Sequence, residues 1–224
     1  MRLGLNRTEH RMPAPIIHVV DDDEPLRIAL VRLLRVKGYE VRTYASAGDF
    51  LITPPSEAPG CLILDLQMPG PSGLALQDAL ERSAVTLPIV FLTGHGDVAS
   101  SVRALKAGAV DFLTKPVEPD VLLAAVAIAL ARDDKLRASR AGVAVARSRW
   151  ATLTEREREV FEHVVAGSLN KVIAGELGIT ERTVKAHRHE VMAKMGARSV
   201  AELVGMAHLL RGPGVLTKPT HPIA

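Results

Sequence analysis

The fold is decided by residues 61–70, Cys61-Leu62-Ile63-Leu64-Asp65-Leu66-Gln67-Met68-Pro69-Gly70. Four apolar residues lead into a single carboxylate, and a Pro-Gly turn signal follows. A short apolar run bounded by turn signals is typical of a strand buried on both faces of a parallel sheet. Asp65 then lies at the carboxyl end of the strand, where open α/β sheets bind their ligands. A lone aspartate at such a position more often only caps the following turn, so a ligand-binding role for Asp65 depends on what stands at the ends of the other strands.

Strand-like and helix-like segments alternate through the first half of the chain. Strands are predicted at 16–20, 40–44, 61–64, 88–93 and 111–114, each followed by a helical pattern. Five such βα units predict a parallel sheet with right-handed crossovers and helices on both faces. No Gly-x-Gly-x-x-Gly follows the first strand, which disfavours dinucleotide binding.

The ends of four strands carry polar residues that suit one chemistry. Asp21 and Asp22 follow the first strand, Asp65 the third, Thr93 ends the fourth, and Lys115 follows the fifth. In a flavodoxin-like strand order the ligand crevice lies between strands one and three. Three carboxylates there suit Mg²⁺, which prefers oxygen ligands. Asp65 is then a nucleophile for a phosphoryl donor, with Lys115 and Thr93 stabilising charge on the transferring oxygens.

Residues 15–131 resemble the receiver domain of two-component response regulators, particularly those of the NarL/FixJ type. The resemblance rests on Val20-Asp21-Asp22, Leu64-Asp65-Leu66-Gln67-Met68-Pro69, Leu92-Thr93-Gly94-His95-Gly96 and Asp111-Phe112-Leu113-Thr114-Lys115-Pro116. It implies that Asp65 is the phosphoacceptor, that Asp21 and Asp22 bind Mg²⁺, and that the Gln67 backbone carbonyl is a further metal ligand. Gln67 and His95 are expected to flank the path of water to the acyl phosphate and to tune its lifetime, in a direction that stays open.

The same resemblance implies a switch and a partner surface. Thr93 and Phe112 form a coupled switch, although Phe112 alone is equally well read as a core aromatic. Receivers are expected to pair, on phosphorylation by a sensor histidine kinase, through the 98–107 helix and the fifth strand. The candidate dimer residues are Val98, Val102, Lys106 and Asp111. His18, inside the first strand, is expected to be a satisfied core histidine.

Charge separates the two halves of the chain. Residues 1–131 contain 12 Lys and Arg and 15 Asp and Glu, whereas residues 132–224 contain 16 and 10. A basic second half suggests a polyanionic partner. Charged residues interrupt every apolar run, so neither a membrane span nor a secretory signal is expected. A single cysteine fits a reducing compartment, and the cytoplasm is the expected location.

The second half predicts a helical domain. Thr154 and Glu157 form a capping box, a further helix starts at Ser168 or Asn170, and Thr180 caps a helix from Glu181 to Met195. A fourth helix follows Ser199, and the helix, Gly-containing turn and helix match a helix-turn-helix. Between the domains, residues 132–149 are either one continuous helix or a flexible tether.

Residues 150–211 resemble the LuxR-type DNA-binding domain. The matching runs are Leu153-Thr154-Glu155-Arg156-Glu157-Arg158-Glu159-Val160, Asn170-Lys171-Val172-Ile173-Ala174 and Thr180-Glu181-Arg182-Thr183-Val184-Lys185-Ala186-His187. By this resemblance Lys185, Ala186 and His189 face base edges in the major groove. The residues expected to contact phosphates are Lys171, Thr180, Thr183, His187 and Arg188.

The fold class is therefore α/β plus all-α: a flavodoxin-like receiver at 15–131, a helical linker at 132–149 and a four-helix DNA-binding domain at 150–211. The expected function is phosphorylation-controlled transcription, with Mg²⁺ as cofactor and promoter DNA, the kinase, a second copy of the chain and RNA polymerase as partners. A free-standing aspartyl phosphatase is disfavoured because Gln67 stands where such enzymes place a second carboxylate. A constitutive DNA-binding protein stays open. Tails at 1–14 and 212–224 are expected to be disordered, and either Met1 or Met12 is the start.

Overall fold

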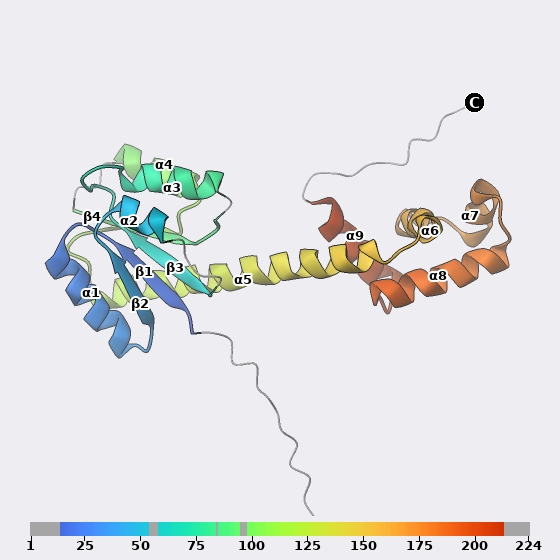
Figure 1. Cartoon of the computed structure of the whole chain (residues 1–224), viewed down its shortest axis with the longest axis horizontal. Helices are drawn as coiled ribbons and strands as arrows, with labels where there is room; N and C mark the ends of the chain where they lie inside the picture. The colour runs from blue at the N-terminus through green and yellow to red at the C-terminus, as the bar shows by residue number, and fades with distance from the viewer. Residues whose placement is uncertain (1–13, 54–57, 84, 95–97, 213–224) are drawn as a thin grey trace, which may run out of the picture. The chain divides into compact units, whose positions relative to one another are not determined.

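The computed structural model describes residues 14–53, 58–83, 85–94 and 98–212 (Figure 1). The predicted tails lie outside these ranges apart from Ala14 and Gly212, as do His95 and the choice between Met1 and Met12. The chain divides into two compact units, with the boundary along the sequence between Leu136 and Arg137, and each is described by itself.

The first unit contains a five-stranded parallel sheet of order β2-β1-β3-β4-β5. This order confirms the predicted flavodoxin-like sheet. The strands are β1 (Ile16–Val20), β2 (Glu40–Tyr44), β3 (Gly60–Leu64), β4 (Ile89–Thr93) and β5 (Asp111–Thr114). The helices between them are α1 (Glu24–Val36), α2 (Ala47–Ile52), α3 (Gly73–Arg82) and α4 (Val98–Lys106).

Helices cover both faces of the sheet. One core cluster joins the sheet to α1 and to α5 (Pro119–Ala151), through Leu34 and Leu122 among others. The second joins the opposite face to α2, α3 and α4, through Phe50, Leu76 and Ala104. β1, β3 and β4 are buried along their whole length, as expected for a parallel sheet covered on both sides.

His18 is the core histidine that the sequence predicts. It is 2% exposed, and its Nδ1 lies 3.1 Å from the hydroxyl oxygen of Tyr44. Burial lowers the pKa of His18 to about 4, so the imidazole is neutral at neutral pH.

The predicted linker is helical throughout, because α5 runs without a break over 33 residues from Pro119 to Ala151. Asp133 attaches its first part to the sheet: the carboxylate is 1% exposed and its Oδ2 accepts a 2.9 Å hydrogen bond from the Gly60 backbone N–H. Within the described ranges, no helix has both the length and the apolar character that a membrane span requires.

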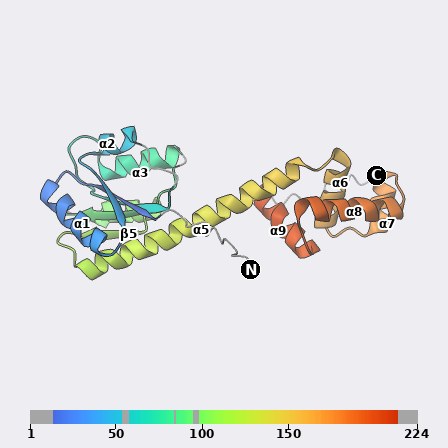
Figure 2. The ribbon, with the colours of Figure 1, turned by 60° about the horizontal axis from the view of Figure 1, so that its bottom comes forward.

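The second unit is helical around its own core. After the last part of α5 come α6 (Glu155–Val165), α7 (Asn170–Leu177), α8 (Glu181–Met195) and α9 (Val200–Arg211). Phe161, Ile173, Val184 and Leu203 bring all four into one core cluster. α7 and α8 are neighbours in both views, joined by Gly178 in the left-handed conformation at φ 65° (Figure 2). This is the predicted helix-turn-helix arrangement.

Candidate functional site

An acidic cluster lies at the carboxyl edge of the sheet in the first unit. Val20 of β1 is paired with Leu64 of β3, so the residues that follow them, Asp21 and Asp65, leave the sheet side by side. The carboxylates of Asp21, Asp22 and Asp65 each offer an oxygen, and these oxygens all lie within 4.8 Å of one another. Asp21 and Asp65 are 2% and 6% exposed, whereas Asp22 is open to solvent. The structure thus brings together the three carboxylates that the strand ends predict.

Lys115 joins two of these carboxylates from the end of β5. Its Nζ lies 2.6 Å from Asp21 Oδ2 and 3.0 Å from Asp65 Oδ2. Its backbone N–H donates to the Thr93 carbonyl at 2.7 Å, which extends the pairing of β4 with β5 and directs the side chain across the cluster. Burial by itself lowers the pKa of Lys115, but its hydrogen bonds to Asp21 and Asp65 outweigh that effect and raise the pKa. Lys115 is therefore a fixed cation beside Asp65.

The second oxygen of each buried carboxylate accepts a backbone hydrogen bond. Asp21 Oδ1 accepts from the Asp23 N–H at 2.9 Å, and Asp65 Oδ1 from the Gln67 N–H at 3.3 Å. Burial raises the pKa of Asp21, while the Lys115 ammonium and the Asp23 N–H oppose the rise. These contacts hold the carboxylates in place at the turn after each strand.

Arg27 also stabilises this edge of the sheet, a role that was not predicted from the sequence. Its guanidinium donates to the Asp21 carbonyl at 2.6 Å and so fixes the turn between β1 and α1. The available signal was its place in the first turns of a helix that begins directly after the acidic run. A single arginine on a helix gives no indication of which carbonyl it contacts.

The donor set of the cluster fits a hard divalent cation. Its side-chain ligands are all oxygens, one from an exposed carboxylate that leaves room for water, and within the described residues no histidine or cysteine joins them. Oxygen ligands on a wet rim are typical of Mg²⁺ sites. Asp21, Asp22 and Asp65 could hold such an ion.

Thr93 and Phe112, the predicted switch pair, lie on the adjacent strands β4 and β5. Thr93 is fully buried, and Phe112 is half-buried with its ring centroid 6.0 Å from that of Phe91. Among the predicted dimer residues, Val98 and Val102 are 79% and 43% exposed. Lys106 is exposed as well, and Asp111 is half-buried.

A second candidate site is the exposed face of α8. Its Val184, Val191 and Met195 are buried in the domain core, so the opposite side of the helix faces outward. Of the residues expected to read bases, Lys185, Ala186 and His189 are all exposed. The residues expected at phosphates divide into two groups: Lys171 and Thr180 are exposed, whereas Thr183, His187 and Arg188 are half-buried. Thr180 caps α8 by accepting the Thr183 N–H at 3.2 Å.

Two contacts that the sequence did not indicate hold α8 in place. Lys194 Nζ lies 2.7 Å from both carboxylate oxygens of Glu157, and this carboxylate also completes the predicted capping box with Thr154. At the end of α8, the Arg149 guanidinium donates to the Met195 carbonyl at 2.8 Å. The Lys194 ammonium thus pairs with Glu157 of α6 and is not part of the exposed basic face of α8.

Comparisons with known proteins find matches to both parts of the chain. Residues 17–127 match the response regulator receiver domain, and residues 151–207 match the bacterial regulatory proteins of the luxR family. Nodulation protein W of Bradyrhizobium diazoefficiens is 45% identical over 87% of this chain and 86% of its own length. The transcriptional regulatory protein FixJ of Rhizobium meliloti is 45% identical over 85% of this chain and 94% of its own. The solved structure of the response regulator StyR has a TM-score of 0.76 and 45% identity, covering 87% of this chain and 98% of that one.

Two domain matches in this order, together with full-length relatives at this identity, show the family. The acidic edge lies within the first matched region and the basic helix within the second. The chain belongs to the two-component response regulators, as a transcriptional regulator with a receiver domain followed by a LuxR-family DNA-binding domain.

Proposed function

We propose that Asp65 is the phosphoacceptor of this regulator and that its phosphorylation controls DNA binding. The observation that carries the proposal is the position of Asp65, a nearly buried carboxylate held by the Gln67 N–H and lying 3.0 Å from the Lys115 ammonium. An Asp65 carboxylate oxygen attacks the phosphorus of a phosphohistidine on the sensor kinase. The phosphorus–nitrogen bond breaks, and an acyl phosphate forms on Asp65.

The neighbouring groups stabilise this transfer. The Lys115 ammonium is already directed at Asp65, so it can neutralise a phosphoryl oxygen there without rearranging. The buried Thr93 hydroxyl donates to another phosphoryl oxygen. Asp21, Asp22, Asp65 and the Gln67 carbonyl would hold Mg²⁺, which when bound supplies further positive charge to the transferring group. Hydrolysis of the acyl phosphate by water resets the protein.

The acyl phosphate then changes how the protein associates. Thr93 moves toward the phosphoryl group, the Phe112 ring turns inward, and two receivers pair through the face that carries Val98, Val102, Lys106 and Asp111. Support for this surface is the exposure of Val98 and Val102, two apolar side chains on one helix. Pairing places two DNA-binding domains on two half-sites of a promoter, where they act on RNA polymerase in the cytoplasm.

Base recognition is assigned to Lys185, Ala186 and His189, and affinity to phosphate contacts from the residues around them. Lys171, Thr180, Thr183, His187 and Arg188 make those contacts. Ala186 is exposed but presents only one methyl group, so its contact with a thymine methyl group is weaker than that of a larger aliphatic side chain.

The test measures mass in solution and promoter affinity with and without Mg²⁺ plus a small acyl-phosphate donor, on the wild type and on Asp65→Asn. A donor-dependent shift to dimers with tighter DNA binding, absent from Asp65→Asn, is expected. Equal mass and affinity in every condition would refute phosphorylation control and favour a constitutive DNA-binding protein. Loss of the donor-induced dimer in Val102→Asp, with acyl-phosphate formation intact, is expected if the pairing surface is correct.

A further inference from the structure

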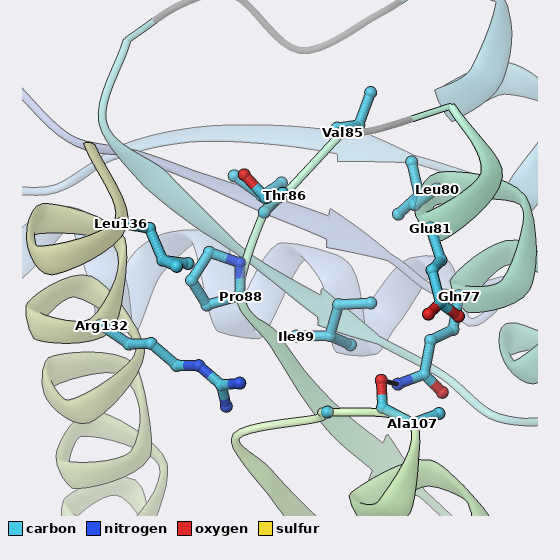
Figure 3. Close-up of a pocket in the computed structure, with 12 residues that line it drawn as sticks. Gln77, Leu80, Glu81, Val85, Thr86, Pro88, Ile89, Ala107, Arg132 and Leu136 are labelled. Carbon is cyan, nitrogen blue, oxygen red and sulfur yellow. Dashed lines mark hydrogen bonds between the residues drawn. The ribbon is translucent and has the colours of Figure 1, made fainter. Parts of the chain in front are cut away.

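Gln77 is a polar side chain buried where α3 packs against α4. It is 4% exposed, and the other buried residues of α3 are glycine and leucines. Its Nε2 donates to the carbonyls of Ala104 and Ala107, at 3.1 and 3.2 Å, and Figure 3 shows the side chain reaching Ala107. Ala104 lies in the last turn of α4, and Ala107 directly follows the helix. The Ala104 carbonyl also accepts the Ala109 N–H at 3.0 Å, so Gln77 adds a second donor there and supplies a donor to the Ala107 carbonyl. Gln77 therefore caps α4 from the neighbouring helix, and we call this pair of hydrogen bonds the Gln77 latch.

The latch carries an internal cost. Gln77 Oε1 is buried and has no hydrogen-bond partner among the described residues. Turning the amide over would not relieve this, because Oε1 would then face the two carbonyl oxygens that Nε2 now bonds. A buried acceptor without a partner offsets part of what the two hydrogen bonds contribute. The closed latch is thus favoured by less than two fully satisfied hydrogen bonds would give, and a modest opposing free energy is enough to open it.

The end of α4 is closed by backbone hydrogen bonds from Gly108 and Ala109, and its side-chain contacts add little to them. Ala104 is its one fully buried residue, whereas Val98 and Val102 face outward. Arg103 forms a 2.8 Å ion pair with Asp78 of α3, but the two side chains are 60% and 37% exposed, so the pair contributes little. Gln77 is accordingly a buried polar tie between the two helices.

The structure also leaves space beside the latch. A hollow of about 240 Å³ is lined by Gln77 and Ala107 together with Leu80, Ile89 and Arg132 (Figure 3). Protein interiors are normally close-packed, so a helix end can move only where there is room. Ala107 and Gly108, which directly follow α4, border this hollow, so the segment that ends the helix has room to move once the latch opens.

We propose that the Gln77 latch holds α4 in the position described here and so weakens self-association until Asp65 is phosphorylated. This rests on the proposed function in one respect, namely that the exposed face of α4 is the pairing surface. Opening the latch lets Oε1 reach water and leaves α4 free to adopt the arrangement that pairs. Gln77 is a positioning residue, since it is buried against the end of α4 and acts on the pairing surface only through that helix.

The test compares the wild type with Gln77→Met, which keeps the length of the side chain and removes both the donors and the buried acceptor. The dimer dissociation constant is measured by sedimentation with and without Mg²⁺ and an acyl-phosphate donor. We expect Gln77→Met to self-associate about tenfold more tightly than the wild type without the donor, with the donor effect reduced by the same factor. Asp78→Asn, which removes only the exposed ion pair between the same two helices, is the matched control and should match the wild type.

The outcomes separate the latch from the proposed function. If the donor tightens the wild-type dimer and Gln77→Met behaves identically, the latch is refuted and phosphorylation control stands. If the wild type ignores the donor but Gln77→Met associates more tightly, phosphorylation control is refuted, whereas the restraint that the latch places on self-association is supported. A Gln77→Met protein that melts at a lower temperature but keeps wild-type association would show a purely structural role and would also refute the latch.

Discussion

Replacing Lys194 by methionine tests the ion pair between Lys194 and the nearly buried Glu157 in the DNA-binding domain. The Glu157 carboxylate is 7% exposed and accepts both close contacts from Lys194, at 2.7 Å each. Removing one partner of a buried pair typically costs about 3–5 kcal/mol. The Lys194 side chain is 32% exposed, and Glu157 still accepts the Thr154 N–H at 2.8 Å in the variant. We therefore expect Lys194→Met to lower the free energy of unfolding by about 2–3 kcal/mol at neutral pH, at or below the lower end of that range.

The loss should depend on pH in a defined direction. The Lys194 hydrogen bonds, opposed by burial, lower the pKa of Glu157 from its ordinary value of 4.5. Because the pKa in the folded state lies below that in the unfolded state, the ionised carboxylate stabilises the fold above pH 4.5, and this stabilisation disappears as the pH falls through the folded-state pKa. The difference between wild type and Lys194→Met should therefore shrink as the pH is lowered below this value.

The assay is urea unfolding of the whole chain, monitored by tryptophan fluorescence. The chain has one tryptophan, and Trp150 packs against Phe161 with ring centroids 4.8 Å apart, so its emission reports on the DNA-binding domain. Glu159→Gln, which removes an exposed partner of Arg156, is the control and should change stability by less than about 0.5 kcal/mol. Adding Glu157→Gln to Lys194→Met should recover at least half of the loss. A pH-independent loss, or none, would contradict the reasoning.

Three further predictions concern the receiver and the DNA surface. The His18 imidazole should titrate near pH 4 by NMR, because burial lowers its pKa in the folded state. Protonation then favours the unfolded state, so the free energy of unfolding of the receiver should fall by about 3 kcal/mol between pH 6.5 and pH 4. A titration midpoint near pH 6.5 would contradict this. Asp133→Ala should destabilise the receiver by about 2 kcal/mol in calorimetry, since the Gly60 N–H loses its acceptor. Asp134 is exposed, so Asp134→Ala should have almost no effect. Equal effects of the two substitutions would refute the proposed role of Asp133 in holding α5 to the sheet. DNA binding is measured by fluorescence anisotropy over a range of salt concentrations. Lys185→Ala should reduce the discrimination between bases at one position of the site by about 1–3 kcal/mol, whereas Lys171→Ala should weaken binding to all duplexes alike and reduce the slope of log affinity against log salt concentration by about one per site. Reversed results would exchange the two roles.

Much of the fold was predictable because its signals are local. The apolar runs that end in Asp21, Asp65 and Thr93 correspond to β1, β3 and β4, and the parallel order brings their ends to one edge. Thr154, Thr180 and Ser199 cap the helices that the sequence places after them. Strand burial and helix caps depend on residues within a few positions of one another, so the pattern along the chain is sufficient to predict them.

The three-carboxylate cluster was predictable for a second reason. Parallel strands place all their carboxyl ends at one edge, so topology converts separate motifs into one cluster. The linker was less accessible: its composition suits both a helix and a tether, and the structure has one continuous helix, α5. Packing of Ala146 and the Asp133 contact help to hold that helix, and neither is visible in a local pattern.

The sequence alone determines where the five strands and most of the helices lie and which polar residues stand at the strand ends. Tertiary structure determines the pairings: Lys115 with two carboxylates, Lys194 with Glu157 rather than with the exposed basic face, and Gln77 with the end of α4. These partners are between 27 and 94 positions apart in the chain, so only the packed backbone brings them within hydrogen-bonding distance. A buried polar group is stable only when such a partner is present, and its identity depends on packing that no local periodicity encodes.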